Sequence, residues 1–162
     1  MAQSEVGIGL GSNIGDKADN IREAMRRLCA DGRVHLTALS QIYRTPPWGP
    51  VAQDFFANAC ALVRTAMEPL ALLDLAKEIE AEMGRAQTVR WGPRLIDIDI
   101  LFYGHRTLAG GRLTLPHPEL FNRAFVLVPL AEIAPEMRIG GTSVRDAARA
   151  MPDEGIFAWD GR

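Results

Sequence analysis

The sequence is poor in several features that would direct it to particular classes of protein. Its 162 residues include only two cysteines and two lysines, and the formal net charge is −2. No apolar run approaches the roughly 18 residues that cross a bilayer, so we expect no membrane protein. The nearly balanced charge lacks the overall basic footprint of nucleic-acid binders. We therefore expect neither a membrane nor a nucleic acid among its partners.

The few cysteines indicate a reducing compartment. Cys29 and Cys60 fall inside a predicted helix and a predicted strand, without Cys-x-x-Cys spacing. This pattern is typical of small buried thiols. The opening residues Met-Ala-Gln-Ser-Glu show no basic segment followed by an apolar stretch, so no signal peptide is predicted. We expect a cytoplasmic protein.

What is present is an ordinary globular balance, with 48% hydrophobic and 23% charged residues. This balance excludes a mainly disordered chain, a collagen-like fibre and a coiled coil. The length suits one domain over residues 1–162, which we expect to act as a monomer. Of the 18 cationic residues, 16 are arginine, the residue that makes planar, two-pronged contacts with phosphate or carboxylate. Genome composition explains that number equally well. Only the positions of the arginines can therefore indicate whether they form a binding site for phosphate or carboxylate.

Hydrophobic spacing predicts the order β-α-β-β-α-β in the first hundred residues. The predicted strands cover 6–10, 34–43, 56–65 and 95–102, and the helices cover about 16–30 and 69–83. This order is the split βαβ arrangement, in which an antiparallel sheet carries two helices on one face. We predict an α+β, ferredoxin-like core. After Gly104 we expect an irregular C-terminal extension with a hairpin and short helical pieces.

Two aspartates stand two residues apart in the clearest predicted strand. Alternation places Asp97 and Asp99 on one face, opposite Ile96, Ile98 and Ile100. Their spacing of about 6.6–6.8 Å lets the carboxylates share an ion or hold two. Hard oxygen ligands suit Mg²⁺, which completes its shell with water and substrate phosphates. The alternative is a half-exposed strand with an acidic outer face.

Arginines precede this acidic pair on a segment rich in glycine and proline. Arg85, Arg90 and Arg94 stand there. Cations beside paired carboxylates fit a Mg²⁺-bound polyphosphate, with the acids on the metal and the arginines on the phosphate oxygens. Ordinary Asp–Arg salt bridges are the alternative.

A histidine between two prolines is a further candidate. The backbone of His117 is restricted by Pro116 and Pro118. Its imidazole could donate to a phosphate oxygen or transfer a proton, or simply complete a turn. Arg112 and Arg123 would enlarge a cationic site, or else be surface residues.

The segment Thr45-Pro46-Pro47-Trp48 and the strand after it suggest a planar ligand. Phe56 and Asn58 lie two apart and share a face, which combines a flat apolar surface with a two-way hydrogen-bonding amide. That combination suits a heterocycle. The alternative is a core phenylalanine beside an asparagine that satisfies a turn.

The glycines after the first strand do not form a dinucleotide fingerprint. In the segment 9–15 the third glycine is one place late for G-x-G-x-x-G, and two successive strands follow the helix. Neither lysine belongs to a Walker A motif, and no kinase catalytic-loop signature is present. Any nucleotide chemistry must therefore use another scaffold.

Together these residues resemble the 6-hydroxymethyl-7,8-dihydropterin pyrophosphokinases of folate biosynthesis. The likeness runs from about Gly9 to Met137, and its most specific part is the complete string Arg-Trp-Gly-Pro-Arg-x-x-Asp-x-Asp over 90–99. The other matching segments are Gly11-Ser12-Asn13, Tyr43-Arg44-Thr45-Pro46-Pro47, Pro116-His117 and Asn122-Arg123.

The resemblance implies a ferredoxin-like fold and pyrophosphate transfer from ATP to the hydroxymethyl group of the pterin, releasing AMP. It implies that Asp97 and Asp99 bind two Mg²⁺ ions and act in catalysis with Arg85 and Arg94. The residues implied at ATP are Arg85, Arg94, Ile100, Arg112, Thr114, His117 and Arg123. Those implied at the pterin are Thr45, Pro46, Pro47, Trp48, Phe56, Asn58, Trp91 and Phe125, with Phe56 and Phe125 on either side of the ring.

The sequence departs from the family pattern in three places. Gln87 stands where many members have a further arginine, Trp48 stands where leucine is common, and Pro118 follows the histidine. Two other functions remain open: a ferredoxin-like module that binds a nucleotide without turnover, and a kinase that transfers only the γ-phosphate.

Overall fold

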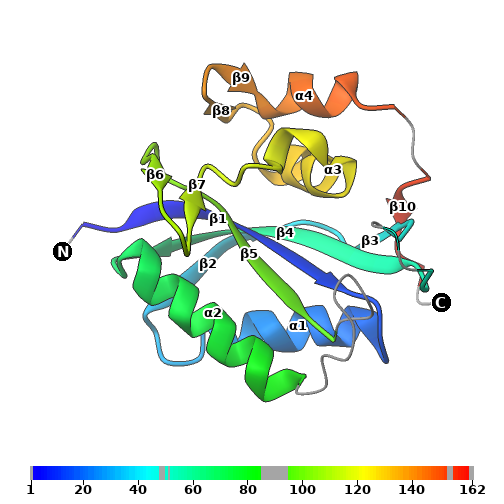
Figure 1. Cartoon of the computed structure of the whole chain (residues 1–162), viewed down its shortest axis with the longest axis horizontal. Coiled ribbons are helices and arrows are strands. Elements are labelled where there is room, and N and C mark those ends of the chain that lie inside the picture. The colour runs from blue at the N-terminus through cyan, green and yellow to red at the C-terminus, as the bar shows by residue number, and fades with distance from the viewer. Residues whose placement is uncertain (1, 48–49, 51, 85–94, 153–154, 161–162) are drawn as a thin grey trace.

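A central antiparallel sheet lies between two layers of helices (Figure 1). The computed structural model describes residues 2–47, 50, 52–84, 95–152 and 155–160. Helices α1 and α2 cover one face of the sheet, and α3 covers the other with α4 packed against it (Figure 1). Each face has its own cluster of buried apolar side chains.

The first two-thirds of the described chain contain the predicted core elements. They are β1 (Ser4–Ser12), α1 (Lys17–Leu28), β2 (Val34–Leu39), β3 (Tyr43–Thr45), β4 (Phe56–Thr65), α2 (Pro69–Met83) and β5 (Asp97–Tyr103). The later elements are β6 (Leu108–Ala109), β7 (Thr114–Leu115), the 3₁₀ turn η1 (Leu120–Asn122), α3 (Ala124–Ile133), β8 (Arg138–Ile139), β9 (Thr142–Ser143), α4 (Val144–Ala150) and β10 (Phe157–Ala158).

The main sheet has the strand order β10-β3-β4-β1-β5, and β2 also pairs with β4. Every pairing in it is antiparallel. With β2 and β3 taken as one interrupted strand, this is the order of a ferredoxin-like fold, and the predicted fold class is confirmed.

The prediction of one continuous strand over 34–43 is wrong near its end, because the strand is interrupted at 40–42. Strands β2 and β3 separate at Ser40, whose hydroxyl accepts a hydrogen bond from the Cys60 backbone N–H at 2.9 Å. The next amide, of Gln41, donates to the carboxylate of Glu132 on α3. Side-chain hydrogen bonds thus join the chain here beside one remaining backbone bond, from the Ser40 N–H to the Cys60 carbonyl at 2.9 Å.

Local sequence explains the first helix and its position. The Asp16 side chain accepts a hydrogen bond from the Asp19 backbone N–H at 3.2 Å, which caps α1 as predicted. Ile21, Met25 and Leu28 form its buried stripe. Pro69 occupies the first turn of α2, where its missing N–H costs no helical hydrogen bond.

Helix α3 gives the C-terminal third more structure than the sequence indicates. Its sequence is apolar except for Glu132 and contains Pro129, so it shows neither a polar face nor an uninterrupted helical pattern. Leu127 and Leu130 are fully buried in the apolar cluster that also contains Phe102 of β5. No helix in the described part of the chain is long and apolar enough to cross a membrane.

Candidate functional site

A cavity of about 280 Å³ lies between the start of α3 and the face of the sheet that α3 covers. Its walls come from β1, β3, β4, β5 and α3, with one side chain from α2. Eight of the residues implied at the substrates line it: Thr45, Pro46, Phe56, Asn58, Asp97, Asp99, Arg123 and Phe125.

Glycines of the central strand β1 form the floor of the cavity. Val6, Ile8 and Leu10 are buried on the face toward α1 and α2, so the alternating glycines occupy the opposite face. Without side chains there, β1 leaves a trough between the functional groups of its two neighbours. Strand register places these groups in two rows across the sheet, Asp97–Gly11–Asn58 and Asp99–Gly9–Cys60.

The acidic side of the trough comes from β5. Asp97 and Asp99 are half-buried, while Ile98 and Ile100 are buried in the core on the other face, as alternation predicts. Glu80 of α2 accepts a hydrogen bond from the Ile98 backbone N–H at 2.7 Å, which fixes the outer edge of this strand.

The carboxylates of this pair are the groups in the cavity best suited to a metal ion. Among the described residues, no group of three or more His, Cys, Asp or Glu could hold one. Two carboxylates fit Mg²⁺, which usually takes one or two from the protein and fills its shell with water and phosphate oxygens.

The opposite side of the trough combines aromatic rings with an amide. Phe56 and Asn58 come from β4 and face the cavity together, and Phe125 enters it from α3. The Asn58 amide donates from Nδ2 to the Thr45 hydroxyl at 2.7 Å, and Asn58 is only 7% exposed. This bond fixes the amide orientation, so a flat ligand would meet a preset hydrogen-bonding edge.

Cationic and imidazole groups flank the acidic pair. The Arg123 guanidinium carbon lies 5.6 Å from the centroid of the Phe125 ring. The Nδ1 atom of His117 accepts a hydrogen bond from the Glu119 backbone N–H at 3.1 Å, so neutral His117 has its proton on Nε2. Burial lowers the pKa of His117, the charge of Asp99 opposes this change, and the charge of Arg123 adds to it. His117 does not line the cavity, but it interacts electrostatically with two residues that do.

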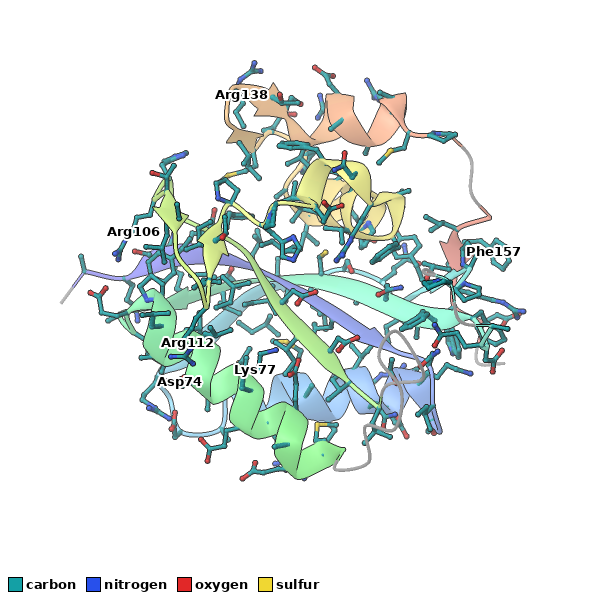
Figure 2. All side chains as sticks on the ribbon, in the orientation of Figure 1. Asp74, Lys77, Arg106, Arg112, Arg138 and Phe157 are labelled. Atoms are coloured by element: carbon teal, nitrogen blue, oxygen red, sulfur yellow. The ribbon has the colours of Figure 1, made fainter. Side chains whose placement is uncertain are left out.

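Three residues implied at the nucleoside lie outside the cavity lining. Ile100 is buried in the core, so only its backbone could meet a ligand. Arg112 pairs with Asp74 of α2, as Figure 2 shows. Thr114 is exposed in β7, with its hydroxyl 3.4 Å from the Gly110 carbonyl.

Some of the implied site residues fall outside the described residues. They are Trp48, Arg85, Trp91 and Arg94, together with Arg90 and the departure at Gln87. Pro47 is described and exposed, next to the Pro46 that lines the cavity.

Sequence reasoning missed seven residues that line the cavity: Gly9, Leu10, Gly11, Ala59, Cys60, Lys77 and Val126. The glycines had a signal, because Gly7, Gly9 and Gly11 alternate with apolar residues and so leave one strand face bare. The thiol of Cys60 has a pKa raised by burial, and its Sγ lies 3.5 Å from the Val126 carbonyl. Lys77 extends from α2 next to β5, a placement that helical spacing does not indicate (Figure 2).

The missing side chain at Gly11 leads to a first prediction. A Cβ there would lie 2.7 Å from the Asn58 Oδ1, so the amide must move and its bond to Thr45 weakens. We expect Gly11→Ala to weaken binding of a ligand read by Asn58 by about ten-fold, close to one lost hydrogen bond. Isothermal titration measures this, with Gly111→Ala as control because nothing lies within 4 Å of its added Cβ. Equal affinities in both variants contradict the role of Asn58.

Comparisons with known proteins agree on one family. A family model described as 7,8-dihydro-6-hydroxymethylpterin-pyrophosphokinase (HPPK) matches residues 7–135. A 2-amino-4-hydroxy-6-hydroxymethyldihydropteridine pyrophosphokinase from Methylorubrum extorquens is 49% identical over 149 residues, covering 92% of this chain and 94% of the relative. The enzyme of that name from Bacillus subtilis is 40% identical over 152 residues, covering 94% of this chain and 88% of the relative.

Solved structures share the fold at low sequence identity. An HPPK-DHPS crystal structure in complex with substrates superposes with a TM-score of 0.75 at 16% identity, over 93% of this chain. The wild-type Plasmodium falciparum HPPK-DHPS with pteroate gives a TM-score of 0.72 at 17% identity, over 91% of this chain. This chain spans only 43% and 42% of those two longer chains, so they support the fold alone.

Proposed function

The chain belongs to the 7,8-dihydro-6-hydroxymethylpterin-pyrophosphokinase family and transfers pyrophosphate from ATP to hydroxymethyldihydropterin in folate biosynthesis, and we propose that both substrates meet in the cavity between β1 and α3. The observation that carries this proposal is that the acidic pair and the aromatic-amide wall face each other across the glycine trough. A phosphate chain and a flat ring need these two surfaces at a short distance.

Asp97 and Asp99 hold ATP through magnesium, with two ions per site. The fit is chemical: two half-buried carboxylates offer hard oxygen ligands, and the triphosphate supplies the remaining ones. When bound, the metal neutralises phosphate charge.

Arg123, which lines the cavity, contacts phosphate oxygens next to this pair. By family likeness the Nε2–H of His117, which lies outside the cavity lining, donates to a phosphate oxygen as well. By family likeness Arg85 and Arg94 add phosphate contacts, and Ile100, Arg112 and Thr114 lie at the nucleoside.

The pterin ring stacks between Phe56 and Phe125, and the amide of Asn58 reads its edge. Pro46 and Thr45 close the same wall, with Pro47, Trp48 and Trp91 contributing by family likeness. This arrangement directs the hydroxymethyl group toward the acidic side of the trough.

The reaction needs positioning more than covalent help from the protein. The oxygen of the primary alcohol attacks the β-phosphorus in line and loses its proton to solvent. The bond between the β-phosphorus and the oxygen that bridges it to the α-phosphate breaks, and AMP leaves with that oxygen. Most of the rate then comes from holding the two substrates together and from cations placed where charge develops.

We also propose that the whole chain acts as one monomeric pyrophosphokinase domain in the cytoplasm. Cys29 and Cys60 are both free thiols, which suits a reducing compartment. Sedimentation at working concentration and cell fractionation test the two statements.

A nucleotide-product assay tests the reaction. Incubation with ATP, Mg²⁺ and 6-hydroxymethyl-7,8-dihydropterin is expected to give AMP and the pterin diphosphate in equal amounts, and no AMP without the pterin. ADP among the products would identify a γ-phosphate kinase. Nucleotide binding without turnover would identify a binding module.

A further inference from the structure

Thr45 of β3 and Phe56 of β4 form one wall of the proposed pterin site, and the rear side of this wall faces away from the cavity. Thr45 pairs with Phe56, and the next pair along these strands is Arg44 with Ala57. Since neighbouring residues of an extended chain point to opposite faces, Arg44 and Phe55 lie behind the cavity residues Thr45 and Phe56. Contacts that hold Arg44 and Phe55 in place therefore also hold their neighbours Thr45 and Phe56.

A cluster of cations and aromatic rings occupies this rear side. The Arg44 guanidinium carbon lies 3.7 Å from the Phe55 ring centroid, and the Lys17 ammonium lies 4.3 Å from it. The Phe55 and Trp159 ring centroids are 5.6 Å apart. Phe157 adds a ring 5.9 Å from Arg44. Each such contact contributes modestly, but together they fix both strands that carry the wall.

The two outer rings come from the C-terminal end of the chain. Strand β10 pairs with β3, with Phe157 opposite Arg44, at the sheet edge (Figures 1 and 2). Pairing continues to Trp159, whose backbone N–H donates to the Ile42 carbonyl at 2.7 Å. The family match ends at residue 135, so this segment lies outside the part of the chain that the family model covers.

The segment before Phe56 is also held from the β1–α1 side. The Lys17 ammonium pairs with the Asp54 carboxylate at 2.9 Å, and the Lys17 side chain is only 10% exposed. The Asn13 amide donates to the Gln53 side chain at 2.7 Å. The wall is thus anchored on one side by α1 and on the other by the C-terminal segment.

We propose that Trp159, acting through Phe55 and Arg44, is a positioning residue that holds the Thr45–Phe56 wall in the geometry that binds the pterin. The proposal rests on the proposed function, because it takes the ligand of this wall to be the pterin. Removing Trp159 leaves the acidic side of the trough unchanged, so the effect falls on the pterin and not on the nucleotide.

The test compares Trp159→Ala and Trp159→Phe in the full-length protein. Titration calorimetry measures the pterin Kd with Mg²⁺ and a non-hydrolysable ATP analogue present, and the Kd of that analogue separately. We expect Trp159→Ala to weaken pterin binding by about five-fold or more through lost preorganisation. The analogue Kd should stay within about two-fold, and Trp159→Phe should restore most of the loss.

Amide hydrogen exchange gives a second measure that catalysis does not influence. We expect Trp159→Ala to speed exchange in 43–45 and 55–57, but not in α1 or α2. Arg44→Met is a second variant should the first fail to fold, and the same loss of pterin affinity is expected. Arg145→Ala is the control, because its ion pair with Glu136 lies far along the chain from this cluster.

Unchanged pterin affinity in folded Trp159→Ala overturns the positioning role. So does an equal loss for the pterin and the analogue, since that indicates general destabilisation. A wild-type protein that binds no pterin instead overturns the proposed function, which keeps the two failures distinct.

Discussion

Asp97→Ala or Asp99→Ala is expected to abolish pyrophosphoryl transfer while leaving the fold intact. Each change removes one of the two carboxylates on the acidic side of the trough. Loss of one preorganised group that stabilises transition-state charge costs roughly 10²–10³-fold in kcat, and a lost metal ligand costs at least as much. AMP formation at saturating ATP, Mg²⁺ and pterin measures this.

The fold should survive because these aspartates are not part of the core. They are half-buried at the sheet edge, and packing of β5 depends on Ile98 and Ile100 on the other face. Thermal unfolding of both variants should therefore stay near that of the wild type. Asp31→Ala is the matched control, since it removes an exposed carboxylate that is bonded to Arg33 and does not line the cavity. Near-normal turnover of either active-site variant with Mg²⁺ contradicts the metal assignment.

Phe56→Ala and Phe125→Ala are each expected to raise the KM for the pterin by roughly 10- to 100-fold, which is about 1.4–2.7 kcal/mol of stacking and buried area. Both rings line the cavity: Phe56 comes from β4 and Phe125 comes from α3. The KM for ATP should change by less than about three-fold in Phe56→Ala, because that ring is not on the acidic side. In Phe125→Ala it should change by at most about five-fold, through the lost contact with Arg123. Steady-state kinetics with each substrate varied in turn measures this difference.

Phe121→Ala serves as the matched control for the ring deletions. Phe121, like Phe125, packs against the apolar cluster that contains Leu127 and Leu130 of α3, but Phe121 does not line the cavity. It should lower thermal stability without changing the KM for the pterin. If Phe121→Ala raises that KM as much as Phe125→Ala does, the effect comes from helix packing and the stacking role is wrong.

Period-two alternation was enough to predict, from the sequence, which strand residues of the candidate site share a face. It placed Asp97 with Asp99, and Phe56 with Asn58, on faces that the structure brings to one cavity. These residues sit on strands whose opposite faces carry continuous apolar residues, so their register leaves little freedom. The fold class followed from hydrophobic periodicity of both kinds, helical and strand-like. Together they gave the order β-α-β-β-α-β, which few folds satisfy.

Other parts of the site depend on contacts between distant segments, which no local pattern encodes. Phe125 and Arg123 come from the start of α3, a helix without a polar face. Lys77 reaches the cavity from α2 next to the sheet edge. Trp159 joins the rear of the wall through pairing between β10 and β3, more than one hundred residues apart. Such placements follow from tertiary packing and become visible only in the assembled fold.

A crystal structure with Mg²⁺, a non-hydrolysable ATP analogue and 6-hydroxymethyl-7,8-dihydropterin tests the central claim most directly. We expect both carboxylates of the acidic pair within about 2.0–2.1 Å of magnesium, with the metal also bound to phosphate oxygens. The pterin should lie between Phe56 and Phe125 with its hydroxymethyl group toward the β-phosphorus. Magnesium held elsewhere, with Asp97 and Asp99 facing away from it, would contradict the account.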